Sequence, residues 1–109
     1  MQVSDQGSPD LATTSFNALS VGTTATNLAK LTTNKVDVRA KRGIQFKAGS
    51  GNSGIIVLGG SSVSYNATAS NINGIPLEAG DTIFLEVTRL SAIFADASAS
   101  GQVLHWIAY

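Results

Sequence analysis

The stretch from Asn73 to Val87, NGIPLEAGDTIFLEV, holds the densest structural signals in the chain. Asn73-Gly74 predicts a turn, because both residue types tolerate a positive φ. Pro76 fixes its own φ and favours an extended conformation in the residue before it, as on the edge of a sheet. A second turn is expected at residues 79–81, Ala-Gly-Asp. The stretch therefore predicts a short edge segment between two turns.

A strand is predicted directly after the second turn. The side chains alternate from Thr82 onward, and successive side chains of a strand point to opposite faces of its sheet. One row of this strand is Ile83, Leu85 and Val87, and the other row is Thr82, Phe84 and Glu86. The aliphatic row is expected to face the core. Residues 44–48 alternate in the same way, with Gln45 and Lys47 expected to point outward and the other three residues inward.

The rest of the chain repeats this pattern of short strands separated by Gly, Asn and Ser. Further strands are expected over residues 13–21, 23–31, 36–39, 44–48, 55–58, 63–65, 91–97 and 102–109. The end of the second of these, residues 28–31, also fits a helical turn. Turn signals come about every ten residues, which is typical of an all-β fold. We predict an antiparallel β-sandwich or jelly roll of about seven to eight short strands, formed by one domain over residues 13–109. Residues 1–12 are polar and are expected to form a flexible N-terminal arm.

Composition excludes several kinds of site. The chain has 109 residues and no cysteine, so disulfides and thiolate metal sites are excluded. Seven basic and seven acidic residues cancel, and only 13% of the residues are charged. A neutral chain of this kind has no electrostatic footprint for nucleic acid or for an anionic membrane, so neither is an expected partner. Weak charge repulsion also makes self-association easy.

Several predicted strands are apolar on both faces, which bears on assembly. In residues 102–109 one row is Val103, His105, Ile107 and Tyr109, and the other row is Leu104, Trp106 and Ala108. A small antiparallel sandwich normally turns one face of each sheet to water, so a second apolar face needs cover from a loop or from another chain. We therefore expect a homo-oligomer, although the sequence leaves open which face of each strand is core. The candidate residues of a subunit or partner interface are Phe84, Glu86, Phe94, His105, Trp106 and Tyr109.

No catalytic arrangement is visible in the sequence, and we expect no enzyme activity. His105 is the only histidine, and no Gly-x-Ser-x-Gly motif accompanies it, so a packing or interface role is favoured over a general base. Glu78 and Asp81 flank the second turn, where a carboxylate commonly caps backbone N–H groups. Only 6% of the residues are aromatic, which disfavours a glycosidase site that stacks sugars. A basic cluster is best interpreted as a solvated edge or a contact to an acidic protein; it comprises Arg39, Lys41, Arg42 and Lys47.

The turn from Pro76 to Asp81, Pro-Leu-x-x-Gly-Asp, resembles the corresponding turn of cupin jelly rolls. Cupins hold a metal ion with several histidines and a carboxylate. Because this chain has one histidine, it lacks that set of ligands, and no metal or other cofactor is expected.

A broader resemblance covers residues 43–109. The segments that carry it are Gly54 to Ser61 (GIIVLGGS), Gly74 to Asp81 (GIPLEAGD), Leu85 to Val87 (LEV), Leu90 to Ala95 (LSAIFA) and Ala99 to Tyr109 (ASGQVLHWIAY). Together they are similar to small all-β structural proteins of tailed bacteriophages. That family shows a strand ending in Gly-Gly, a Pro-Leu-x-x-Gly-Glu/Asp turn and a C-terminal strand with Gly-Gln and Trp.

The resemblance implies a capsid decoration or cement protein on the outer surface of the phage head, made in the host cytoplasm. Such a protein would act as a trimer, or alternatively a dimer, and would bridge subunits of the major capsid protein. Two other functions stay open. One is a head–tail, tail or fibre component, and the other is a carbohydrate-binding module for host adhesion, whose stacking residues would be Tyr65, Trp106 and Tyr109.

Overall fold

The computed structural model describes residues 16–32, 37–66 and 71–109. The predicted arm, residues 1–12, lies outside this part of the chain. The elements in chain order are β2 (Phe16–Val21), β3 (Thr26–Asn27), α2 (Leu28–Leu31), β4 (Ile44–Ala48), β5 (Ile56–Gly59), β6 (Ser64–Asn66), β7 (Asn71–Asn73), β8 (Ile75–Leu77), β9 (Thr82–Leu85), the 3-10 turn η1 (Leu90–Ala92), β10 (Phe94–Ala97) and β11 (Gln102–Ala108).

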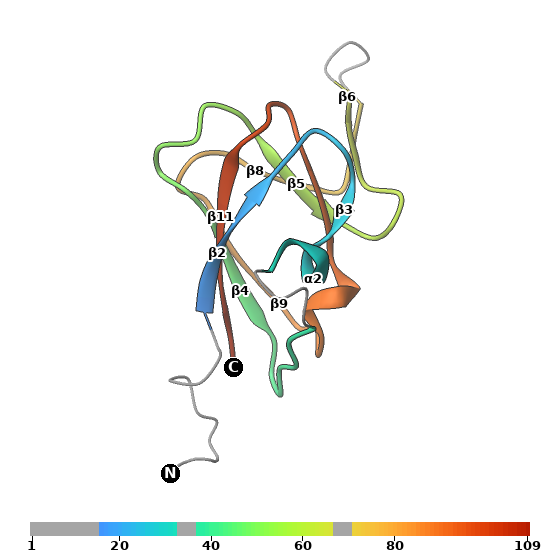
Figure 1. Ribbon diagram of the computed structural model, residues 1–109, viewed down its shortest axis with the longest axis vertical. Coiled ribbons are helices and arrows are strands. Elements are labelled where there is room, and N and C mark those ends of the chain that lie inside the picture. Colours follow the sequence, from blue (N-terminus) through green and yellow to red (C-terminus); the bar gives the residue numbers. More distant parts are fainter. Residues whose placement is uncertain (1–15, 33–36, 67–70) are drawn as a thin grey trace.

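Two four-stranded antiparallel sheets pack together as a sandwich (Figure 1). The first sheet has the order β2-β11-β4-β9, and the second sheet has the order β3-β10-β5-β8. The chain crosses from one sheet to the other at every connection except that from β5 to β8, where the β6–β7 hairpin is inserted. This winding is a jelly roll. The predicted fold class is confirmed.

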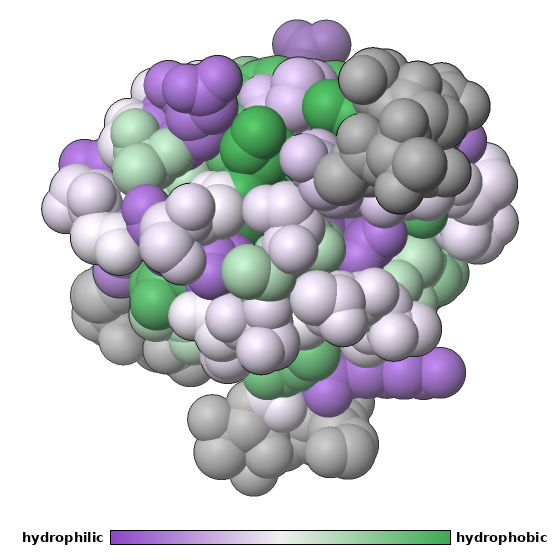
Figure 2. All heavy atoms as spheres, turned by 90° about the horizontal axis from the view of Figure 1, so that it is seen from above, coloured by the Kyte–Doolittle hydropathy of each residue, from purple (hydrophilic) through white to green (hydrophobic). Residues whose placement is uncertain are grey.

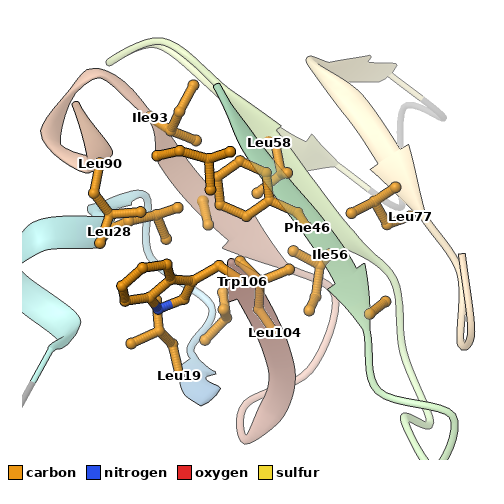
Figure 3. Close-up of a cluster of buried hydrophobic side chains, with 14 of the residues drawn as sticks. Leu19, Leu28, Phe46, Ile56, Leu58, Leu77, Leu90, Ile93, Leu104 and Trp106 are labelled. Carbon is orange, nitrogen blue, oxygen red and sulfur yellow. The ribbon is translucent and has the colours of Figure 1, made fainter. Parts of the chain in front are cut away.

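The core lies between the two sheets and follows the predicted alternation. In β4 the residues Ile44, Phe46 and Ala48 are buried, while Lys47 is exposed. In β11 the even-numbered residues are buried, and Trp106 is only 4% exposed. Figure 3 shows side chains of both sheets meeting in this cluster; the labelled ones are Leu19, Leu28, Phe46, Ile56, Leu58, Leu77, Leu90, Ile93, Leu104 and Trp106.

The β6–β7 hairpin covers the middle of the outer face of the second sheet. Val57 lies on that outer face, because its neighbours in β5 point into the core, yet it is completely buried. A Cβ atom added to Gly74, just after β7, would lie 2.7 Å from Val57 Cγ1 and 2.8 Å from Val63 Cγ2. The hairpin therefore sits directly on the sheet. Residues 55–58 are apolar on both faces, and cover from within the chain explains this.

A buried carboxylate hydrogen-bonds the hairpin to the second sheet. Asp96 in β10 is buried on the same outer face. The backbone N–H of Tyr65 in β6 donates to Asp96 Oδ2 at 3.1 Å, and that of Ala97 donates to Asp96 Oδ1 at 2.8 Å. Both carboxylate oxygens are therefore used, as a buried charged group requires.

Both predicted turns are present, but the first does not connect two paired strands. Gly74 has φ 135°, but it forms the corner that leads from β7 into β8 rather than a hairpin turn. The second turn is closed by two bonds between Glu78 and Asp81: the Asp81 N–H donates to Glu78 O, and the Glu78 N–H donates to Asp81 Oδ2, both at 2.9 Å. β8, with Pro76 at its centre, is an edge strand as expected.

Three local predictions need correction. The strand expected from residue 91 begins only at Phe94, because Leu90 is fully buried at the start of η1 and its N–H donates to Val38 O at 2.8 Å. The strand from Thr82 ends at Leu85, because the Val87 N–H turns back to Leu85 O at 2.9 Å. Of the strand expected over residues 36–39, residue 36 lies outside the described residues, and residues 37–39 form no named strand; Arg39 makes a single bridge to Arg89.

The helical alternative for residues 28–31 is correct. Asn27 ends the short strand β3 and caps α2, since its Oδ1 accepts a hydrogen bond from the Ala29 N–H at 2.9 Å. Leu28 then points into the core and is fully buried. The turn thus closes one end of the sandwich.

A polar contact fixes the chain around η1. The Ser91 N–H and Oγ donate to the two oxygens of Asp37 at 2.9 and 2.7 Å, and Arg89 Nη1 lies 3.9 Å from Asp37 Oδ2. Partial burial of Asp37 acts to raise its pKa, but the Ser91 hydrogen bonds and the Arg89 charge together outweigh burial. The pKa of Asp37 is therefore lower than its ordinary value.

Candidate interaction surface

The outer face of the first sheet is accessible to solvent along all four strands, whereas the hairpin covers the middle of the outer face of the second sheet. We call it the open face. Its side chains are exposed or half-buried, and they are Ala18, Ser20, Gln45, Lys47, Thr82, Phe84, Val103, His105 and Ile107. The strand registers bring them together from four segments that are far apart in the sequence. His105 lies between Ala18 and Lys47, and Gln45 lies between Ile107 and Phe84.

An aromatic pair marks one end of the open face. Phe84 is 47% exposed and Tyr109 is 40% exposed, and their ring centroids are 6.0 Å apart in an edge-to-face arrangement. The Tyr109 hydroxyl donates to Gln45 Oε1 at 3.3 Å. Gly43 lies against the Phe84 ring, and an added Cβ atom there would be 2.5 Å from Phe84 Cζ. The pair is held in place by its neighbours while both rings stay accessible.

Two adjoining open depressions lie on this face. The larger has a volume of about 590 Å³, and its lining includes Lys47, His105 and Ile107. The smaller, of about 420 Å³, is lined by Arg42 and by the two aromatic rings among others. Gln45 and Thr82 line both depressions, so the two are continuous. Among the described residues that line them there are basic side chains and no carboxylate.

The loop end of the sandwich has a different character. The loops between β4 and β5 and between β10 and β11 meet there, at the top of Figure 1. Figure 2 views the molecule from that side, and weakly hydrophilic residues dominate it, with scattered hydrophobic ones. Its polar groups bond to one another: the Val103 N–H donates to Asn52 Oδ1 at 2.8 Å, and the Gly54 N–H donates to Gln102 Oε1 at 2.8 Å. These groups stabilise the loops.

The predicted interface residues do not form one surface. Phe84, His105 and Tyr109 lie together on or beside the open face. Phe94 is half-buried on the outer face of the second sheet, next to Asn27 and Gly59.

Glu86 is exposed but lies beyond the end of β9, in the tight turn between Leu85 and Val87. It is therefore not in the row of Phe84, contrary to the alternation expected from the sequence. The turn breaks the two-residue period of the strand at this point.

Trp106 is not part of the candidate interface, because its side chain is buried in the core. Its indole is part of the core cluster, where it points toward Leu19 and Leu28 (Figure 3). The indole Nε1 is buried and has no hydrogen-bond partner among the described residues. Burial also removes Trp106 as a sugar-stacking residue. Tyr65, another such candidate, is half-buried in the hairpin.

Several members of the open face were not anticipated as site residues. Gln45, Thr82 and Ile107 line the depressions, and each comes from a different strand. Alternation predicted that Gln45 and Thr82 point away from the core. Only the strand register shows that they are neighbours.

The basic cluster of the sequence is divided by the fold. Lys47 is on the open face and Arg42 is at its margin, whereas Arg39 pairs with Arg89 through the backbone. Across residues 16–32, 37–66 and 71–109, no group of three or more His, Cys, Asp or Glu side chains is placed to hold a metal ion. No helix in the same part of the chain is long and apolar enough to cross a membrane.

The chain matches no protein-family model, no curated protein and no solved structure with significant similarity. The functional argument therefore depends on the open face and on the sequence motifs.

Proposed function

We propose that this chain is a structural protein of a tailed-bacteriophage virion, a capsid decoration or cement protein. In this role it binds the major capsid protein on the outer surface of the head and acts as a homo-oligomer. The motifs at Gly54–Ser61, Gly74–Asp81 and Ala99–Tyr109 support the proposal through their resemblance to such proteins. The jelly roll is compatible with it, because viral capsid proteins commonly use this fold. Lectins and cupins use it as well, so the fold alone does not decide the function.

The observation that carries the proposal is the open face. The middle of the outer face of the second sheet is covered by the chain's own hairpin, whereas the first sheet exposes Phe84, Tyr109 and Val103. Exposed aromatic side chains held in fixed positions are frequent anchors of protein interfaces. A protein that binds through such a face needs no catalytic group, which agrees with the sequence analysis.

The mechanism follows from multivalency. An oligomer that contacts two or more capsid subunits at once gains avidity, because the second contact forms at a high effective concentration. Binding only to the assembled shell stabilises that state by mass action. A modest interface on each copy is then sufficient to strengthen a capsid.

The test of location is cryo-electron microscopy of the virion encoded by the same genome. We expect density for the jelly roll at regular positions on the outer head surface, in contact with the major capsid protein. Density at the head–tail junction, the tail or a fibre would overturn the decoration role in favour of another virion part. Complete absence from the particle would refute the virion proposal.

The test of the surface is a matched pair of variants. Phe84→Ala removes an aromatic anchor from the open face, and Ile72→Ala removes a comparably exposed apolar side chain from β7. We expect Phe84→Ala to weaken binding to capsids lacking the protein by about tenfold or more, in the range of interface anchors. Ile72→Ala should bind as the unaltered chain does. Equal behaviour of the two variants would show that the open face is not the binding surface.

A second candidate function rests on the aromatic pair. Phe84 and Tyr109 stand beside Gln45 and Arg42 in the smaller depression, and this combination of ring faces and polar groups suits a sugar. Carbohydrate binding would then serve adhesion to the host. Glycan-array binding that is lost in Tyr109→Ala and kept in Tyr65→Ala would support this function. An array with no signal would exclude it for the glycans tested.

A further inference from the structure

We propose that the open face binds the N-terminal segment, residues 1–15, of a second copy of this chain. The inference deepens the homo-oligomer part of the proposed function and rests on it: the open face holds the copies together, and Phe84→Ala weakens capsid binding because the oligomer and its avidity are lost. The segment lies outside the described residues, so the inference is argued from its sequence and from the surface offered to it.

Charge complementarity is the first argument. Residues 1–15 contain Asp5 and Asp10 and no lysine or arginine. The two depressions of the open face are lined by Lys47 and Arg42 and by no carboxylate among the described residues. Opposite charges steer association and select the partner, whereas two open faces placed against each other would bring like charges together. An acidic segment therefore suits this face better than a second open face does.

Apolar character is the second argument. The segment carries the apolar side chains of Met1, Val3, Leu11 and Ala12 among polar ones. The open face offers Ile107, Phe84 and Tyr109 around its depressions. A peptide that binds along a groove typically uses a few such anchors and leaves its other side chains in water.

Position and length are the third argument. The described chain begins at Phe16, which pairs with Ile107, a residue that lines the larger depression. Fifteen residues reach up to about 50 Å when extended, and a four-stranded sheet is only about 15–20 Å wide. The segment is therefore long enough to cross the open face of an adjacent molecule.

The scarcity of strong turn residues near Phe16 favours a neighbour over the same molecule. To lie on its own open face, the segment would have to reverse direction immediately before Phe16. Residues 11–15, Leu-Ala-Thr-Thr-Ser, contain no Gly, Pro, Asn or Asp, and Ser15 is the one residue among them of the types that dominate turns. From Phe16 back toward the N-terminus, the first Gly, Pro, Asn or Asp residues are Asp10, Pro9 and Gly7.

The test is a charge swap in the full-length chain. One variant carries Asp5→Lys and Asp10→Lys, which makes the segment basic. The other carries Arg42→Glu and Lys47→Glu, which makes the open face acidic. By sedimentation velocity we expect each variant alone to self-associate at least about tenfold more weakly than the unaltered chain. An equimolar mixture should recover association, because each segment then meets a face of opposite charge. Far-UV circular dichroism and the melting temperature of each variant show whether it is folded.

The matched control changes charges away from the open face. Lys30→Glu in α2 and Glu78→Lys in the turn after β8 are both at exposed positions. Each control, alone or mixed, should associate as the unaltered chain does.

The outcomes separate the inference from the proposed function. Unchanged association of the folded swap variants, or a mixture that fails to recover it, overturns the segment-to-face contact. At about 100 micromolar, a contact with a Kd of that size or tighter is populated. If the unaltered chain is a strict monomer at this concentration, both that contact and the homo-oligomer are overturned. Binding of the unaltered chain to capsids lacking the protein is measured in parallel, and its presence or absence decides the decoration role whatever the swap variants do.

Discussion

Replacing Trp106 with alanine removes the largest side chain of the core and tests where that side chain belongs. Trp106 is only 4% exposed and packs between the two sheets. A buried aromatic residue removes roughly 200 Å² from water, which at about 25 cal/mol per Å² amounts to about 5 kcal/mol. Residual burial in the unfolded chain lowers this figure, and measured Trp→Ala losses are about 3–5 kcal/mol. We expect a loss of about 4 kcal/mol in the free energy of unfolding.

Such a loss is large for this chain. Domains of this size are stable by about 5–15 kcal/mol, so Trp106→Ala should unfold at a much lower urea concentration and melt about 15–20 °C earlier. Because Trp106 is the only tryptophan, the unfolding curves must be followed by far-UV circular dichroism rather than by tryptophan fluorescence. Phe84→Ala is the control at an exposed position and should lose no more than about 1 kcal/mol.

The indole N–H gives a second variant at the same position. Nε1 has no partner among the described residues, so Trp106→Phe removes ring volume and an unpaired donor together. We expect a loss of about 1–2 kcal/mol, well below that of Trp106→Ala. A loss under about 1 kcal/mol in Trp106→Ala, with an unchanged denaturant slope, would refute the core position. Dissociation of an oligomer with an intact fold would place the ring at a subunit contact instead.

Three further predictions concern the parts that hold the fold together. Gly74→Ala should cost at least about 2 kcal/mol in urea unfolding, because Gly74 has φ 135° and no room for a Cβ atom, whereas Gly60→Ala, with open space around it, should stay within about 0.5 kcal/mol. Asp37→Asn should cost about 1 kcal/mol at pH 7. Since the folded pKa of Asp37 is lowered, its contribution is complete above about pH 4 and is lost as the pH falls through the folded value, so the two unfolding free energies should converge in acid; a constant difference would contradict this. Asp96→Ala should cost about 1–3 kcal/mol and speed hydrogen exchange at the Tyr65 amide before the core amides, and unchanged exchange there would show that the carboxylate does not hold the hairpin.

Local pattern predicted a large part of the fold. Alternation correctly assigned the buried and exposed rows of β4, because the two-residue period of a strand is a property of the backbone itself. In β11 it separated the two rows but left open which of them is core. The turns at Gly74 and at residues 78–81 followed from residues that accept positive φ or cap the backbone. The pattern failed at residues 91–93, where Leu90 is held by the distant Val38 carbonyl and a 3-10 turn replaces the start of the strand. It also failed at Glu86, where the Val87 N–H bonds locally to Leu85 O and ends the strand.

The sequence by itself determined that this chain is an antiparallel sandwich of short strands with apolar side chains on both faces of several of them. Only the tertiary structure decided whether the second apolar face of each strand is covered or exposed. Val57 is covered by the β6–β7 hairpin, whereas Phe84 stays exposed on the open face, and Trp106 belongs to the core. The physical reason is that alternation is local, while register and sheet order depend on contacts between strands that are far apart in the sequence. The candidate surface is made by that register, so no single segment could have revealed it.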